Sequence, residues 1–364
     1  MMRRQSGAIL AATLFLVAAA ASSVHAKPPV CTCQNLESLQ QEYKNAAYLE
    51  QFMRQMAEVL RAEEQRLRGL KSTSNSDPDK DLAIQPTVLA LRDGYIRKTM
   101  KLPFPKVKDY TGPTEVNMPY GSCEQSKDDL AAMKAGSPCE AIADATAAHE
   151  LMHRELCRAM GSEAYWDRLP SVKALEEAER YRAQAANMKS ELGRVIEAAD
   201  VRLHGEWRHV IAGPGVEIIY FFQFESGDLT ASSQAGDRWT FSGTGETQNM
   251  LESMTAPGVR CTSSGAYRNS FTVAMDTDGL SYGLDYREEV KGSDLRVTCN
   301  GGMGMAVPTA ESSSGRLGSS LPLVAGDNVV PNGWADTIMA LAASEGMTIT
   351  GEPKTVLSVT CAKP

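Results

Sequence analysis

Two histidines four residues apart are the side chains best suited to chemistry in this sequence. Residues 149–153 read His-Glu-Leu-Met-His, the pattern His-Glu-x-x-His. Histidines at i and i+4 project from the same face of a helix, so both imidazoles can reach one Zn²⁺. The glutamate between them then lies beside the metal, where it can act as general base on a water. We predict that His149 and His153 bind zinc and that Glu150 is the catalytic base.

A catalytic zinc needs a third protein ligand and an open position. The metzincin continuation x-x-Gly-x-x-His is missing, because the next histidine after His153 is His204. Cys157 lies four residues beyond His153, too far along a straight helix to share a coordination sphere with His149. A disulfide is therefore the better expectation for Cys157, and the third ligand must come from another element.

Three glutamates in the next predicted helix are candidates for the third ligand: Glu176, Glu177 and Glu179. Glu177 shares one stripe of that helix with the apolar residues that follow it at helical spacing. The other two point toward flanks richer in arginine and lysine. Helical phase therefore favours Glu177 as the third ligand, and Glu176 and Glu179 stay as alternatives.

This combination resembles the gluzincin branch of the zinc metallopeptidases, in which two histidines and the base come from one helix and a glutamate comes from a second helix downstream. The resemblance covers residues 149–153 and 176–179. It implies a zincin-like helical domain, Zn²⁺ as cofactor and a peptide or protein substrate. It also implies hydrolysis of a peptide bond by water, with Glu150 moving the proton.

Four further residues are candidates for supporting roles. Stabilising a transition state usually needs another donor near the carbonyl oxygen, and Tyr181, His204 and His209 carry suitable groups. Asp144, about one turn before His149, could orient an imidazole from behind. Each has a plainer interpretation as a structural residue at a domain junction or on a solvated helix surface.

The N-terminal residues predict export. Arg3 and Arg4 precede a short apolar run at 8–21, and residues 24–26 form a small-x-small cleavage site. The run is shorter than the roughly 20 residues that span a bilayer. We therefore predict a signal peptide at 1–26 and a periplasmic or secreted protein with no integral membrane segment after cleavage.

Cysteine usage agrees with export. All eight cysteines follow position 26, and an even number in an oxidising compartment predicts disulfides. Five precede residue 200 and three follow it, so complete pairing needs at least one bridge between the halves. The alternative, a metal or redox site at Cys31-Thr32-Cys33, has the spacing of neither a zinc ribbon nor a thioredoxin motif.

The length of 364 residues favours two domains, and 43% hydrophobic with 23% charged residues is typical of a globular protein. The formal net charge of −8 argues against a nucleic-acid binder, which normally carries a basic excess. Apolar periodicity predicts helices at 35–70, 137–160 and 170–196, the second capped by Ser137 and ended by Gly161. Residues 81–122 contain five prolines and read as irregular with short elements.

Beyond residue 203 the sequence reads as short strands separated by turn signals. The runs are 216–224, 238–241, 269–275, 279–286, 295–299 and 356–361, with a long loop at 301–333 and a short helix at 334–343. This pattern favours an antiparallel sandwich or barrel. We predict an α+β protein: a helical zinc domain at 27–203 followed by a sandwich-like antiparallel β domain at 204–364.

The function predicted from these features is that of an exported zinc metallopeptidase. One alternative is a secreted or envelope binding protein with a structural or inactive zinc site, whose β domain binds an unknown partner or ligand. Another is a zinc hydrolase that acts on something other than protein, such as a cell-wall cross-link.

Overall fold

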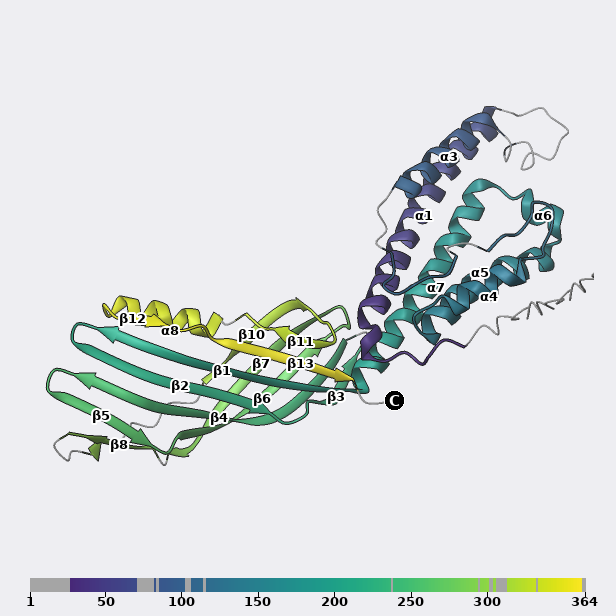
Figure 1. The fold of residues 1–364 in the computed structure, drawn as a ribbon. Coiled ribbons are helices and arrows are strands. Elements are labelled where there is room, and N and C mark those ends of the chain that lie inside the picture. The colour runs from purple at the N-terminus through teal and green to yellow at the C-terminus, as the bar shows by residue number, and fades with distance from the viewer. Residues whose placement is uncertain are drawn as a thin grey trace, which may run out of the picture.

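The computed structural model describes residues 27–70, 82, 85–101, 106–113, 116–236, 238–293, 295–300, 304–305, 313–331 and 333–361. The predicted signal peptide at 1–26 lies outside these residues. Helices occupy the first part of the chain and antiparallel strands the second, so the fold class is α+β, as predicted. The helices that precede the strands gather beyond one end of an elongated, curved sheet (Figure 1).

The described helices are a 3₁₀ turn at Cys33–Asn35, α1 Leu36–Leu70, α3 Pro86–Lys101, α4 Lys127–Ala135, α5 Glu140–Met160, α6 Ser162–Trp166, α7 Pro170–Glu197 and α8 Gly333–Ser344. The long predicted helices are confirmed. Helix α5 begins three residues later than expected, because the hydroxyl of Ser137 donates to the backbone oxygen of Met133 in α4 instead of capping α5. Helix α3 was not predicted, although a proline is well tolerated at the first helical position.

The described strands are β1 Ala199–Gly213, β2 Val216–Ser226, β3 Thr230–Ala235, β4 Arg238–Ala256, β5 Val259–Ser264, β6 Tyr267–Thr277, β7 Ser281–Ser293, β8 Arg296–Cys299, β9 Gly304–Met305, β10 Ser313–Pro322, β11 Gly326–Val329, β12 Thr348–Thr350 and β13 Lys354–Cys361. All six predicted runs overlap strands; the runs at 279–286 and 295–299 begin two residues and one residue before β7 and β8, and the other four lie wholly within strands. The expected loop at 301–333 contains β9, β10 and β11, and β1 begins five residues before the predicted start of the β domain.

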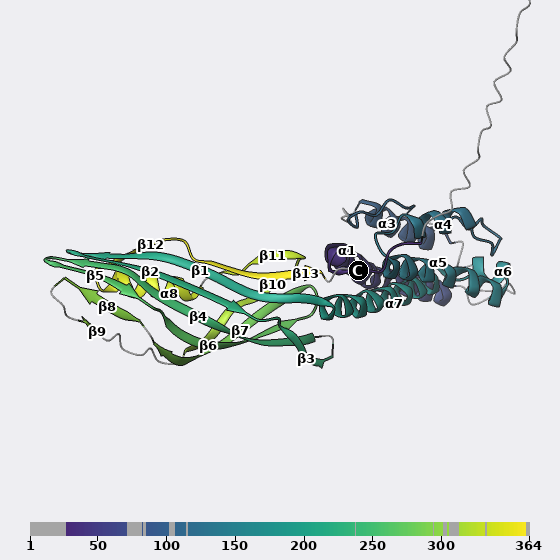
Figure 2. The same ribbon diagram turned by 60° about the horizontal axis from the view of Figure 1, so that its bottom comes forward.

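The strands form one continuous antiparallel sheet rather than two separate sheets stacked on each other. The main path runs β10-β7-β6-β4-β2-β1-β13-β11. Its outermost strands, β10 and β11, are consecutive in the chain, and the sheet curls until they lie near each other (Figure 2). The expected sandwich-like arrangement therefore takes the form of a nearly closed single sheet whose inner face is buried.

One hydrophobic core continues from the helices into the sheet. Its buried members include Leu39, Ile142, Leu192, Phe241 and Leu357. Gly193 of α7 lies directly against the indole ring of Trp239, so a side chain there would clash. The side-chain amide of Gln40 in α1 donates to the backbone oxygens of Gly279 (2.9 Å) and Leu323 (2.6 Å). The ends of α1 and α7 thus fill one end of the curled sheet.

All eight cysteines are paired: Cys31–Cys139, Cys33–Cys361, Cys123–Cys157 and Cys261–Cys299. The Cys33–Cys361 bridge joins the two halves, as the parity of the cysteines required. Two bridges hold α5 near its ends, one at the residue before the helix and one four residues beyond His153. Four disulfides fit a secreted or periplasmic protein.

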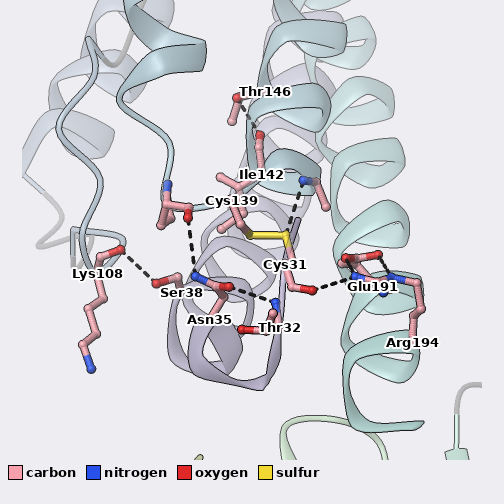
Figure 3. Close-up of a disulfide and its surroundings, with 12 residues drawn as sticks. Cys31, Thr32, Asn35, Ser38, Lys108, Cys139, Ile142, Thr146, Glu191 and Arg194 are labelled. Carbon is pink, nitrogen blue, oxygen red and sulfur yellow. Dashed lines mark hydrogen bonds and ion pairs between the residues drawn. A yellow bond between two sulfur atoms is a disulfide. The ribbon is translucent and has the colours of Figure 1, made fainter. Parts of the chain in front are cut away.

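The Cys31–Cys139 bridge also lies against α7 (Figure 3). The guanidinium of Arg194 in α7 donates to the backbone oxygen of Cys31 at 2.8 Å, and the backbone nitrogen of Ala141 in α5 lies 3.4 Å from the Cys31 sulfur. One short segment therefore fixes the start of α5 relative to α7. Within the described residues, none of the helices combines the length and the apolar character needed to cross a membrane.

Candidate metal centre

Helices α5 and α7 carry the residues that the sequence singled out. His149 and His153 lie one turn apart on α5, with their ring centroids 5.4 Å apart. The first turn of α7 receives a buried carboxylate from α1, because Glu64 accepts from the backbone nitrogen of Ser171 at 3.1 Å. A negative charge at a helix N-terminus is favourable. Helix α7 is therefore anchored six residues before Glu177.

The carboxylate of Glu177 faces both imidazoles. Its Oε2 lies 3.3 Å from His149 Nε2, and its Oε1 lies 3.2 Å from His153 Nε2. One ligand atom from each of the three residues lies within 4.8 Å of the other two. Two imidazole nitrogens and one carboxylate oxygen at this separation can hold a metal ion. The centre is largely enclosed, with His149 only 7% exposed.

The electrostatics suit a neutral imidazole at His153 and an ionised carboxylate at Glu177. Burial lowers the pKa of His153 to about 4, although the charge of Glu177 opposes this shift. Burial by itself would raise the pKa of Glu177, but the hydrogen bond from His149 and the charges of His153 and Arg180 outweigh it and lower that pKa. A neutral imidazole and an ionised carboxylate are the forms that bind metals.

The other two candidate glutamates point elsewhere. Glu176 accepts a hydrogen bond from the guanidinium of Arg168. Glu179 is exposed and pairs with Arg54 of α1, whose Nη2 lies 2.8 Å from its Oε1. The structure therefore brings only Glu177 of the three to the two histidines.

Two residues that the sequence analysis missed contact the candidate ligands, and one of them, Arg180, lies near both ring nitrogens of His153. Arg180, buried at 6% exposure, places Nη1 3.1 Å from Glu177 Oε1 and 2.7 Å from His153 Nδ1. Tyr165 of α6 places its hydroxyl oxygen 3.0 Å from the same nitrogen. The spacing of Arg180 three residues after Glu177 was a usable signal, whereas Tyr165 belongs to a five-residue helix that no periodicity reveals.

A third missed residue, Glu42 of α1, is buried beside the centre and accepts a hydrogen bond from the side-chain amide of Gln184. Burial raises the pKa of Glu42, and the Gln184 hydrogen bond and the charge of His149 act against that rise. Nδ1 of His149 is buried without a hydrogen-bond partner in the described part of the chain. The sequence signal that could have identified Glu42 is a carboxylate on the apolar side of the amphipathic helix α1.

Glu150 and Tyr181 lie beside the candidate ligands. Glu150 directly follows His149, and its backbone oxygen accepts a hydrogen bond from the side-chain amide of Gln125 at 2.6 Å. Burial raises the pKa of Tyr110 to about 12, and the charge of Glu150 contributes to this rise. The Tyr181 ring lies 4.5 Å from the His149 ring, between centroids. Their catalytic roles stay predictions.

The other supporting residues are not brought to this centre. Asp144 is exposed and lies 3.9 Å from the ammonium of Lys134, so it does not orient His149. His204 and His209 lie in β1, which begins after the end of α7. The twenty residues of α7 beyond Glu177 span about 30 Å, and β1 then runs away from the helices (Figure 1).

Both strand histidines have surroundings of their own. His204 lies on the outer face of the sheet, with Nε2 3.4 Å from the Ser358 hydroxyl, and lines a hollow of about 880 Å³. His209 lies on the inner face with its ring stacked on Trp207, 4.1 Å between centroids, and also stacked with Tyr220. Neither has a place in a reaction at the metal centre.

Comparisons of the chain with protein-family models, with curated proteins and with solved structures found no match. The chemistry of the centre itself is therefore the basis for assigning a function.

Proposed function

We propose that this protein is an exported zinc-dependent hydrolase that cleaves peptide bonds. The observation that carries the proposal is the approach of Glu177 to both imidazoles of the His-Glu-x-x-His segment, at 3.3 and 3.2 Å. Three protein ligands of this kind are the set that catalytic zinc sites use, with a further position left for water or substrate. His149, His153 and Glu177 would hold the ion.

The ion would supply a Lewis acid that polarises a carbonyl and makes water a nucleophile at neutral pH. The chain supplies the proton transfer: Glu150, adjacent to His149, accepts a proton from the attacking water and delivers it to the leaving amine. Tyr181, whose ring centroid lies 4.5 Å from that of His149, is the nearer candidate for stabilising the carbonyl oxygen, because His204 and His209 lie in the sheet.

A peptide or protein substrate is the expectation that follows from the gluzincin resemblance. The four disulfides support action outside the cytoplasm, in the periplasm or after secretion. A cell-wall cross-link has the same amide chemistry, so it belongs among the substrates to be tested.

The test compares wild-type protein with Glu150→Gln and with Glu155→Gln, on a quenched-fluorescent peptide library and on purified cell-wall cross-links. Glu155 is an exposed glutamate on the same helix that pairs with Arg154. We expect Glu150→Gln to keep its zinc and lose activity by about 10²- to 10⁴-fold, and Glu155→Gln to match wild type.

Zinc-loaded wild-type protein that cleaves neither substrate would overturn the hydrolase proposal. So would a Glu150→Gln variant as active as Glu155→Gln.

One observation favours a second role for the sheet, that of binding a ligand. The hollow on its outer face is lined by charged and amide side chains, among them Arg202, Glu206, Gln223, Gln248 and Lys354. A binding protein with an inactive zinc site would keep the metal, show no hydrolysis, and lose ligand affinity on substitution of Arg202 or Lys354.

A further inference from the structure

The two ring nitrogens of His153 differ in their further neighbours, although Arg180 Nη1 lies near both, 2.7 Å from Nδ1 and 3.3 Å from Nε2. Nε2 lies 3.2 Å from Glu177, inside the ligand cluster, and Nδ1 lies 3.0 Å from the hydroxyl oxygen of Tyr165. A histidine that gives Nε2 to a metal carries its proton on Nδ1, and that proton needs an acceptor behind the ring. This acceptor fixes the orientation of the imidazole ring toward the metal.

Two candidate partners lie at Nδ1, and their chemistry differs. Arg180 Nη1 lies 2.7 Å away and Tyr165 Oη lies 3.0 Å away. A guanidinium has only donors, so it cannot accept the Nδ1 proton, whereas a phenolic oxygen can. Arg180 suits the opposite tautomer, in which Nε2 carries the proton and points it at Glu177. Only Tyr165 suits the tautomer that binds metal.

The ring of Tyr165 is fixed from several directions. Gly161, with φ at +87°, ends α5 in a left-handed conformation and turns the chain into α6. The Arg168 guanidinium carbon lies 4.1 Å from the centre of the Tyr165 ring, and Arg168 Nε donates to the Tyr165 backbone oxygen at 2.9 Å. Trp166 packs edge-on at 5.3 Å between centroids. These contacts fix the position of the Tyr165 hydroxyl beside His153. None of them involves the hydroxyl itself, so the ring should keep its place when the hydroxyl is removed.

We propose that Tyr165 is a positioning residue for metal binding: its hydroxyl accepts the Nδ1 proton of His153 and holds Nε2 toward the centre shared with His149 and Glu177. This inference rests on the metal site of the proposed function. It adds to the three proposed ligands a fourth residue that does not contact the metal itself. Removing such an outer partner typically weakens metal affinity by about 10- to 100-fold.

The test measures Zn²⁺ affinity by competition with a chromophoric chelator in wild type, Tyr165→Phe and Tyr282→Phe. Tyr282 is the matched control, because its hydroxyl is also buried but has no hydrogen-bond partner among the described residues. We expect about a 10- to 100-fold loss for Tyr165→Phe and wild-type affinity for Tyr282→Phe. Equal affinity in all three proteins overturns the role of Tyr165 and leaves the metal site standing, whereas no Zn²⁺ binding by wild type overturns the proposed function itself.

The visible absorption of Co²⁺-loaded protein distinguishes a changed orientation of the His153 ring at the metal from a general loss of fold stability. We expect altered ligand-field bands in Tyr165→Phe and an unchanged spectrum in Tyr282→Phe. A weaker affinity with an unchanged spectrum would assign Tyr165 a structural role only and overturn the inference.

Wild-type protein offers a second test if Tyr165→Phe does not fold. Histidine ¹⁵N spectra of the Zn²⁺-loaded protein report which ring nitrogen carries the proton. We expect His153 to be protonated at Nδ1, with slow exchange of that proton. A proton on Nε2 would contradict the assignment.

Discussion

Two pairs of histidines show how the same residue type acquires different roles in the two regions of this molecule. His149 and His153 are four residues apart on a helix and share one face, where Glu177 meets both. His204 and His209 are five residues apart on a strand, and an odd spacing sends them to opposite faces of the sheet. Spacing matched to the local period, more than the presence of histidine, creates a site.

The neighbours of each pair sharpen the contrast. The helical pair is surrounded by groups that can donate, accept or carry charge, including Tyr165, Arg180 and Glu177. The inner strand histidine, His209, is stacked with the aromatic rings of Trp207 and Tyr220, and its Nδ1 has no partner among the described residues. The polar partners of the first pair fit metal binding, whereas stacking between aromatic rings fits a packing role for His209.

The largest expected effect separates the two pairs directly. His149→Ala removes one of the three proposed ligands and should weaken Zn²⁺ binding well beyond the roughly 100-fold that an outer partner costs. His204→Ala should leave the Zn²⁺ affinity unchanged, since its ring lies in the sheet. The measurement is chelator competition on both variants, and a similar loss in both would show that the two histidine pairs do not differ in metal binding.

A smaller effect concerns acid stability. The pKa of His153 is about 4 in the fold against roughly 6.5 in an unfolded chain, so between these values the unfolded state binds the extra proton. Stability should therefore fall as pH drops from about 6.5 to 4, by about 3 kcal/mol from this residue.

Urea unfolding with a metal chelator, at pH 7 and pH 4.5, measures this dependence. The His153→Gln variant should show a flatter pH profile than wild type. Equal slopes in the two proteins would exclude His153 as a source of the pH dependence.

The smallest effect is expected at the inner strand histidine. His209→Phe keeps a ring beside Trp207 and removes a buried nitrogen that lacks a partner, but it also loses the ring's hydrogen bond to the Trp207 backbone. These changes oppose each other, so stability should stay within about 1 kcal/mol of wild type, with unchanged Zn²⁺ affinity. Thermal unfolding measures the stability and chelator competition measures the Zn²⁺ affinity. Weaker Zn²⁺ binding by His209→Phe would contradict the separation of the strand histidines from the metal centre.

Local periodicity was sufficient to predict most of the helical region and the heart of the candidate site. Apolar spacing predicted α1 and α7, and helical phase singled out Glu177 from its neighbours, which instead pair with Arg168 and Arg54. These inferences succeed because a helix face is set by residues close in sequence.

Features that depend on tertiary contact were out of reach. The strand β10 is rich in serine and glycine and reads as a loop, and it is a strand because it pairs with β7. Tyr165 reaches His153 only because Gly161 turns the chain back, and Glu42 approaches from a helix over 100 residues earlier. The pairing of Cys33 with Cys361 likewise follows from the fold and not from spacing.

The most direct test of the central claim is a calorimetric titration of Zn²⁺ into metal-free wild-type protein and into Glu177→Gln, with Glu179→Gln as the matched control. We predict one ion per chain for wild type and Glu179→Gln, and a much weaker interaction for Glu177→Gln. No binding by wild type, or equal binding by all three proteins, would show that His149, His153 and Glu177 do not form a zinc site.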